Sequence, residues 1–423
     1  MGPLTHHEIT LMFLSLGLLL GLARVLGELA HRLGQPMVVG EILAGVLLGP
    51  TVLGRISPGT MESLFPATGN LPVVLSGLAT LSIAMFLLVA GLEIELSTIW
   101  RQGRTALAVA VAGIVVPFAL GLASAQAAPY ALGCEPGADP WIFALFFATA
   151  VSISALPVIA KTLMDLGLYR TPLGMIVVSA AVFNDLCGWF IFAMILGMMG
   201  GGDSSGSQVG TTILLTLALT VAMLTVGRWV IHRIMPWLQR CTSGPGGVLG
   251  FAFSLALLGA ALTEWIGIHA VFGSFLVGIA IGDSSHFRDQ TRKTIHDFVG
   301  FLFAPLFFAS IGLRIDFAAK FYPHIVLAVL VIACLGKILG CGLAARCTGT
   351  PPRRAWAIGF AMNARGAMEI ILGLLALRSG IIRERMFVAL VVMALVTSMM
   401  SGPAIQWLLR DGKGEAPEEP AEA

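Results

Sequence analysis

Thirteen apolar runs of helix-spanning length constrain the fold of this chain more than any other feature of its sequence. A transmembrane helix needs about 20 mostly apolar residues. Runs near that length, separated by short polar loops, follow one another at residues 9–29, 36–54, 71–94, 105–130, 141–164, 172–200, 210–235, 247–266, 268–283, 296–314, 323–347, 353–377 and 386–409. They predict an all-α integral membrane protein of about thirteen transmembrane helices, with the lipid bilayer as part of its solvent.

The composition excludes a water-soluble core and several classes of function. Hydrophobic residues make up 57% of the chain and charged residues 11%, whereas soluble domains carry about 25% charged residues. The net charge of +2 is not gathered into a basic patch, so a nucleic-acid partner is not expected. The six cysteines lack metal-ligand spacing, and no cofactor motif or nucleophile–base pair supports an enzyme.

The charges of the loops predict the orientation. Of the 25 Lys and Arg residues, 17 fall in odd-numbered loops and the C-terminal segment, and six fall in even-numbered loops. Positively charged loops stay on the cytoplasmic side. We therefore expect a multi-pass protein of the cell membrane with its N-terminus outside and its C-terminus cytoplasmic. Residues 411–423 are acidic and Pro-rich, and they are expected to form a disordered tail.

Two consecutive spans recur later in the chain. Residues 40–49 (GEILAGVLLG) match 273–282 (GSFLVGIAIG) with three glycines at a constant offset, and residues 86–96 (FLLVAGLEIEL) match 307–317 (FFASIGLRIDF). An odd number of spans separates the copies, so their orientations in the membrane must be opposite. Inverted repeats of this kind are typical of secondary transporters, whose sites form on broken helices near the bilayer midplane.

Two charged residues lie in the middle of apolar runs. Because a charge inside the membrane is costly, such a residue is a candidate functional residue by default. Asp185 follows Asn184 within residues 172–200. A lone carboxylate there can bind a proton or a small cation in competition, which is the minimum requirement for exchange; alternatively, it pairs with a buried cation for packing. Lys337 lies deep in residues 323–347. It can pair with Asp185, carry a proton itself, or extend to an interface.

Residues 141–164 contain a candidate break in a helix. Pro157 removes an amide donor, and the hydroxyl residues Thr149 and Ser152 precede it. A break there would free carbonyls and hydroxyls to coordinate Na⁺ or K⁺. The alternative is a simple proline kink.

Residues 353–377 contain a second candidate break, together with buried charge. Asn363 precedes Arg365, and Glu369 follows four residues later. On a helix, residues four apart share a face and can pair. We therefore expect Arg365 and Glu369 to form a structural ion pair, with direct ion binding as the alternative. Glu41, in residues 36–54, is either a buried partner for a cation or close to the interface.

Seven motifs together resemble a known family. In chain order they are PMVVGEILAGVLLGPTVLG, AGLEIEL, VSISALPVIAKTLMDLGL, AAVFNDLCGW, FGSFLVGIAIG, PLFFASIGLRIDF and NARGAMEII. They are similar to those of the second branch of monovalent cation:proton antiporters, which includes plant cation/proton exchangers and bacterial Kef-type and Nap-type transporters. The resemblance covers about residues 10–409.

The resemblance implies an architecture and a domain organisation. Two broken helices, the fifth and the twelfth, would cross near the midplane. An ion-binding core would move against a dimerisation part within one transporter unit, which would form a homodimer. The implied ranges are 1–423 for the whole unit, 104–200 and 323–410 for the core, and 9–95 and 247–316 for the dimerisation part. Residues 210–235 are expected to form a linker helix, because stretches with the composition of loops, 200–209 and 241–247, bracket them.

The resemblance also implies roles for site residues. Asp185 matches the ion-binding aspartate of the family, Lys337 matches its lysine on the eleventh span, and Thr149 and Ser152 fall on the broken helix near the ion. Asn184 stands where many members carry a second aspartate. In the family this pattern is taken to suggest electroneutral exchange, one cation per proton.

These observations predict a secondary active antiporter that exchanges Na⁺ or K⁺ for protons by alternating access, with Asp185 as the shared cation and proton site. The alternatives are a cation-coupled symporter of a small organic solute, a channel, and a membrane ion sensor that does not transport. A symporter needs solute-specific polar groups inside the membrane, and few such residues remain beyond those named above.

Overall fold

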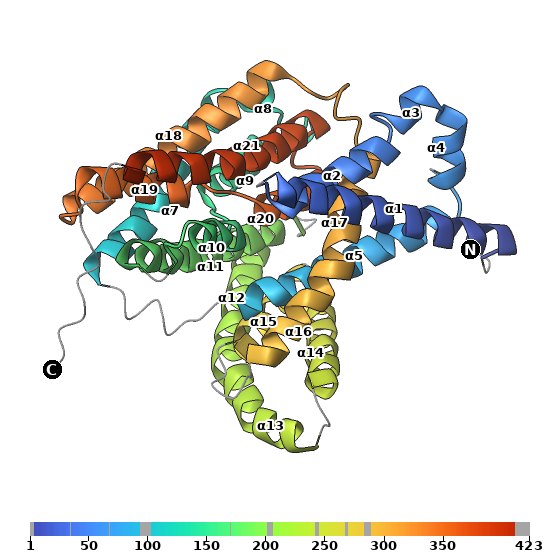
Figure 1. Ribbon diagram of the computed structural model, residues 1–423, viewed down its shortest axis with the longest axis horizontal. Coiled ribbons are helices and arrows are strands. Elements are labelled where there is room, and N and C mark those ends of the chain that lie inside the picture. The colour runs from blue at the N-terminus through green and yellow to red at the C-terminus, as the bar shows by residue number, and fades with distance from the viewer. Residues whose placement is uncertain are drawn as a thin grey trace. The chain divides into compact units, whose positions relative to one another are not determined.

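The computed structural model describes residues 4–33, 35–66, 68–93, 103–169, 171–200, 206–241, 245–266, 270–282 and 289–410, and every regular element within them is a helix (Figure 1). Nine helices of the described ranges are long and apolar enough to cross a membrane, and three shorter apolar helices accompany them. Each of the thirteen apolar runs contains a helix or an interrupted helix. The all-α fold class is therefore confirmed, while the count of membrane crossings stays a prediction. The tail at 411–423 lies outside the described residues.

The chain divides into two compact units, and three of its helices pass from one unit to the other. The first unit comprises Met1–Ser97, Trp189–Tyr322 and Leu375–Val388, and the second comprises Thr98–Gly188, Pro323–Leu374 and Ala389–Ala423. The assignment of these units to a mobile core and a dimerisation part stays a prediction.

The first unit is built on the two repeated segments. Its helices are α1 (His6–Arg32), α2 (Met37–Leu48), α3 (Leu53–Ile56), α4 (Pro58–Leu64), α5 (Leu71–Leu92), α12 (Gly206–Ala222), η1 (Met223–Gly227), α13 (Arg228–Cys241), α14 (Pro245–Ile266), α15 (Ala270–Gly282), α16 (Asp289–Phe298), η2 (Val299–Phe303) and α17 (Ala304–Arg314). The two η segments are π-helical. One apolar core joins residues of α5, α13, α14, α15, α16 and η2.

The repeated glycines make equivalent contacts in the two copies. α2 packs on α17, and α15 packs on α5. A Cβ added at Gly45 would lie 2.9 Å from Gly312 Cα, and a Cβ added at Gly278 would lie 2.9 Å from Gly91 Cα. Gly45 corresponds to Gly278 in the repeat, and Gly91 corresponds to Gly312. Each copy of the first segment therefore packs against the second segment of the other copy, and the two contacts are equivalent.

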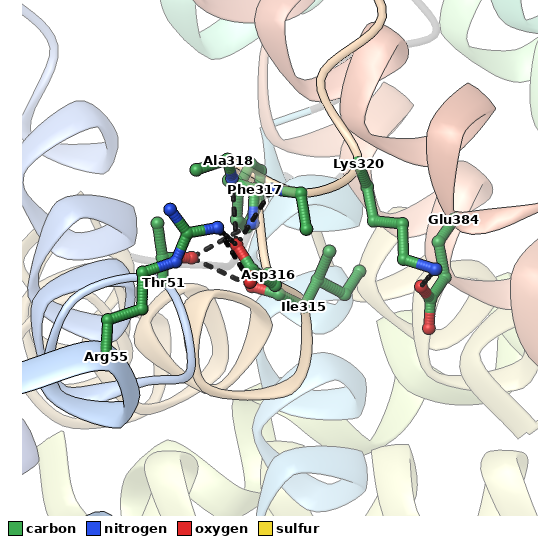
Figure 2. Close-up of polar contacts among 9 residues, drawn as sticks. Thr51, Arg55, Ile315, Asp316, Phe317, Ala318, Lys320 and Glu384 are labelled. Atoms are coloured by element: carbon green, nitrogen blue, oxygen red, sulfur yellow. Dashed lines mark hydrogen bonds and ion pairs between the residues drawn. The ribbon is translucent and has the colours of Figure 1, made fainter. Parts of the chain in front are cut away.

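Polar contacts join residues 51–55 to residues 315–317, which follow α17, in the first unit (Figure 2). The Arg55 Nη2 group donates to both oxygens of Asp316, at 3.1 and 3.2 Å. The hydroxyl of Thr51 donates to the Ile315 carbonyl at 3.2 Å and accepts from the Phe317 amide at 3.0 Å. These contacts hold the end of α2 and the short helix α3 to the loop that follows α17.

The same loop is held from its other end. Lys320 Nζ lies 3.0 Å from Glu384, the first residue of α21, and Figure 2 shows this pair beside Asp316. The hydrogen bond to Glu384, with its charge, raises the pKa of Lys320. Desolvation disfavours ionised Asp316, but hydrogen bonds from the Ala319 amide and from Arg55 outweigh it and lower the pKa of Asp316 below its usual range.

The second unit contains the two interrupted helices. Its elements are α7 (Arg104–Ala127), α8 (Pro129–Leu132), α9 (Pro140–Ser152), α10 (Leu156–Asp165), α18 (Pro323–Cys347), α19 (Pro352–Met362), and most of α11 (Pro172–Gly200), α20 (Ala367–Arg378) and α21 (Glu384–Leu409). α7 packs along α18 and against α9. The first helix break lies at residues 153–155, between α9 and α10, and the second at residues 363–366, between α19 and α20.

The two breaks are hydrogen-bonded to each other. Ser154 Oγ donates to the Met362 carbonyl at 2.7 Å, and the Ala155 amide donates to the Ala364 carbonyl at 3.0 Å. Backbone groups that an interrupted helix leaves without partners must be satisfied inside the protein at membrane depth. Here groups of the first break donate to carbonyls at the second break. These contacts confirm the two crossed, broken helices that the sequence predicts.

Candidate functional site

The carboxyl end of α9 is the centre of a buried polar cluster. The last carbonyls of any helix lack intrahelical donors, and the fully buried Arg365 supplies donors to them here. Its Nη1 donates to Ala150 O at 3.0 Å and to Ile153 O at 3.3 Å. Its Nη2 donates to Val151 O and, at 3.4 Å, to Ala333 O of α18. A cation at this end of α9 is also favoured by the helix dipole.

Lys337 binds the next carbonyl of the same helix end. It is fully buried, so its side chain does not extend to an interface. Its Nζ donates to Gly113 O at 2.8 Å and to Ser152 O. With its amide oriented to satisfy both groups, Asn184 accepts from Lys337 Nζ at 2.8 Å and donates to Ala110 O at 2.9 Å. Three neutral oxygens therefore hold the ammonium group, which has three N–H donors.

Asp185 is buried next to this arrangement. It follows Asn184 in α11 and is 2% exposed. The electrostatic neighbours of Lys337 include Asp185, Glu369 and Arg365. Two buried acids and two buried bases thus meet in the second unit, and with all four ionised the set is neutral. Such a set tolerates one additional positive charge more readily than several, because each unpaired buried charge is costly.

Arg365 and Glu369 attract each other electrostatically, but each makes its hydrogen bonds to other groups. Arg365 lies in the break before α20, so the spacing of a continuous helix does not apply to it. Its guanidinium reaches the carbonyls of α9, while Glu369 Oε2 accepts from the Gly366 amide at 2.8 Å. Asn363 Nδ2 donates to Cys334 Sγ at 3.4 Å. Asn363 and Glu369 therefore stabilise the second break, and Arg365 connects it to the end of α9.

The remaining candidates on the fifth apolar run lie at the first break. Thr149 Oγ1 donates to Leu145 O at 2.7 Å, and Ser152 Oγ donates to Thr149 O at 2.9 Å. Both hydroxyls are buried and keep lone pairs that can accept or coordinate. Pro157 lies in the first turn of α10, where its missing amide costs nothing. The helix is interrupted before Pro157 and not merely kinked.

Glu41 belongs to the first unit, on α2. It is 4% exposed, and a Cβ added at Gly27 of α1 would lie 3.5 Å from Glu41 Cγ. Its charged neighbour is Arg24, which stacks over the Phe301 ring at 4.5 Å. Glu41 is thus a buried residue of the α1–α2 pair.

The backbone acceptors of the cluster were not predicted from the sequence, and Gly113 is the one among them for which a signal exists. It has no functional group, and only its backbone carbonyl takes part. The available signal is Pro117, four residues later in the same helix, because a proline leaves the carbonyl four residues before it without a backbone donor.

Comparisons with known proteins agree with this architecture. The description "Sodium/hydrogen exchanger, transmembrane" matches residues 15–411. The chain is 32% identical over 403 residues to the Na(+)/H(+) antiporter NhaS4 of Synechocystis sp., covering 94% of this chain and 97% of that protein. It is 34% identical over 421 residues to Cation/H(+) antiporter 20 of Arabidopsis thaliana, covering 96% of this chain. The chain spans about half the length of that plant relative, 49%.

A solved structure shares the fold. The sodium proton antiporter MjNhaP1 from Methanocaldococcus jannaschii aligns with a TM-score of 0.70 at 16% identity, over 96% of this chain and all of that one. The relatives named here are antiporters by name. The family match confirms the prediction of a multi-pass transmembrane protein. This chain belongs to the sodium/hydrogen exchanger family of transmembrane proteins.

Proposed function

We propose that this protein is a secondary active antiporter that exchanges a monovalent cation, Na⁺ or K⁺, for protons by alternating access, with Asp185 as the shared site. The observation that carries the proposal is the buried charge cluster at the crossing of the two broken helices, in which Asp185 lies in the electrostatic field of Lys337. The antiporter names of the relatives support the same class of activity.

Charge balance explains why the two substrates exclude each other. With Asp185, Glu369, Lys337 and Arg365 ionised, the cluster is neutral, and a proton or a monovalent cation on Asp185 raises its charge by one. Both together would place a second unpaired charge in a buried site, at a cost of several kcal/mol. We infer that one cation replaces one proton and that the exchange is electroneutral.

The other residues of the cluster have supporting roles in this proposal. Asn184 and the carbonyls of Gly113 and Ser152 hold the Lys337 ammonium. Thr149 and Ser152 complete or orient the cation site through their hydroxyl oxygens. Arg365, Glu369, Asn363 and Pro157 hold the breaks. The second unit would be the moving, ion-binding part, with the first unit as the dimerisation part, in a homodimer of the cell membrane with its C-terminus cytoplasmic.

The test is proton flux in proteoliposomes that contain a pH-sensitive dye. After a pH gradient is imposed, Na⁺ or K⁺ is added outside, and wild type is compared with Asp185→Asn. We expect cation addition to dissipate the gradient in wild type only, and the responding cation identifies the substrate. Asp139→Asn is the matched control, because Asp139 caps α9 in the same unit through the Trp141 amide and lies outside the buried cluster.

Three outcomes would count against the proposal or a part of it. If wild type shows no cation-dependent proton movement at any pH between about 5 and 9, antiport fails, and symport or sensing becomes the next hypothesis. If Asp185→Asn exchanges at the wild-type rate, antiport stands but the shared site lies elsewhere. An exchange rate that follows an imposed membrane potential would contradict electroneutrality.

A further inference from the structure

A proline lies in the interior of α7, at Pro117. In an α-helix the amide of residue 117 would donate to the carbonyl of Gly113. Proline has no N–H, so this carbonyl has no backbone donor. Both residues are buried, and a buried carbonyl without a partner costs about 1–3 kcal/mol. The structure must therefore supply another donor to Gly113.

That donor is the Lys337 ammonium, at 2.8 Å from Gly113 O. Its second carbonyl partner, Ser152 O, is the last one of α9 and also lacks an intrahelical donor, because the helix is broken there. Both backbone carbonyls that hold Lys337 thus lack a helical hydrogen bond, that of Gly113 because of Pro117 and that of Ser152 because α9 ends there.

Glycines of α18 allow the approach that this contact requires. A Cβ added at Gly336, the residue before Lys337, would lie 2.7 Å from Pro117 Cα and 2.8 Å from Pro117 Cβ. One turn later, a Cβ added at Gly340 would lie 2.9 Å from Ala112 O. A side chain at either position would push α18 away from α7, and the Lys337 ammonium would move away from the Gly113 carbonyl.

We propose that Pro117 and Gly336 are positioning residues for Lys337: Pro117 frees the Gly113 carbonyl as an acceptor, and Gly336 lets α18 approach close enough to use it. This role refines the proposed antiport mechanism, and its test by the pH profile of exchange rests on that proposed function. A purely structural proline in this place would have no influence on the protonation of Lys337.

The central variant is Pro117→Ala, which restores an amide that competes with Lys337 for Gly113 O. Alanine favours the helix interior by about 3 kcal/mol over proline, so the variant is expected to fold. The ammonium loses part of one hydrogen bond, worth about two- to tenfold. The alkaline limb of the exchange profile should therefore move by about 0.3 to 1 pH unit toward lower pH.

Pro403→Ala is the matched control, because Pro403 also interrupts a helix of the second unit, α21, but its side chain is exposed. It should leave the pH profile unchanged. If wild type exchanges cations for protons and Pro117→Ala has the same pH profile of exchange, the positioning role is wrong while the proposed function stands.

A double-mutant cycle tests the contact without any transport assay. In Lys337→Met the Gly113 carbonyl has lost its donor, so a restored amide at position 117 satisfies it. Pro117→Ala should therefore raise the melting temperature more in the Lys337→Met background than in wild type. Equal shifts in the two backgrounds would overturn the proposal, even if the protein exchanged no cations.

Discussion

At the scale of single residues, the main feature is that buried cations stabilise a helix end. Arg365 and Lys337 together bind four carbonyls near the end of α9. An arginine presents five N–H donors in a planar fork, whereas a lysine presents three donors at one point. The several carbonyl contacts of Arg365 require that fork, and Lys337 instead uses neutral acceptors from three helices.

Replacement of Arg365 by lysine should therefore destabilise the protein although the charge is kept. We expect Arg365→Lys to lower the free energy of unfolding in detergent by about 1–3 kcal/mol, because at least one buried carbonyl of α9 loses its donor. Arg346→Lys is the control, since Arg346 is exposed and donates to the single carbonyl of Thr350. Equal stability of the two variants would show that the fork geometry is unimportant.

At the scale of elements, the close helix pairs depend on the absence of side chains at the repeated glycines. A Cβ at Gly45 would collide with the Ala309 carbonyl, and one at Gly278 would collide with the Leu88 carbonyl. Backbone atoms cannot rotate away as a flexible side chain can. The two helix pairs of the first unit therefore tolerate only glycine at their crossing points.

Gly45→Ala and Gly278→Ala should each destabilise the protein by about 1–3 kcal/mol through overpacking. Gly17→Ala is the control in a helix of the same unit, because nothing lies within 4 Å of an added Cβ there. It should stabilise α1 by about 0.5–1 kcal/mol. Thermal unfolding in detergent measures all three. Similar effects at Gly45 and Gly278 would support equivalent roles in the repeat, and a neutral result at either would contradict close contact.

At the scale of the whole molecule, loops far apart in sequence are joined by charge pairs. Arg55 and Asp316 are 261 residues apart, yet they form two hydrogen bonds. The pair is partly exposed, so its contribution to stability is expected to be no more than about 1 kcal/mol. Its pH dependence follows from the lowered pKa of Asp316. The stabilisation is complete above the unfolded-state pKa of about 3.9 and is lost as the pH falls through the lower folded-state value.

Asp316→Asn should therefore be less stable than wild type at pH 7, and the difference should disappear in acid, as Asp316 becomes protonated in wild type. Unfolding in detergent between about pH 7 and pH 2 measures it. Glu62→Gln, at an exposed acidic residue of the same unit, controls for the loss of one negative charge. A difference between Asp316→Asn and wild type that stays constant with pH would exclude the ion pair as its cause.

Much of the fold follows from local sequence patterns. Lipid offers the backbone no hydrogen bonds, so each apolar run must form a helix. Pro157, with the small and hydroxyl residues before it, indicates a broken helix, and the structure places the break just before it, at 153–155. The glycine offsets of the two repeats indicate which segments correspond, and Gly45 and Gly278 do make equivalent contacts. Asp185 and Lys337 stand out because charge is rare inside apolar runs.

The helices, their interruptions, the repeat and the identity of the buried charged groups can thus be predicted from local patterns. Which of these groups meet depends on contacts between distant parts of the chain. Arg365 and Glu369 are near neighbours in sequence, but Arg365 binds carbonyls more than 200 residues earlier in the chain. This follows because the last carbonyls of a helix have no intrahelical donors wherever the helix ends. Which distant side chain reaches them depends on how closely α7, α9 and α18 pack, and Gly336 and Gly340 of α18 lie where an added Cβ would collide with α7. Such an approach between helices more than 200 residues apart cannot be read from either segment alone.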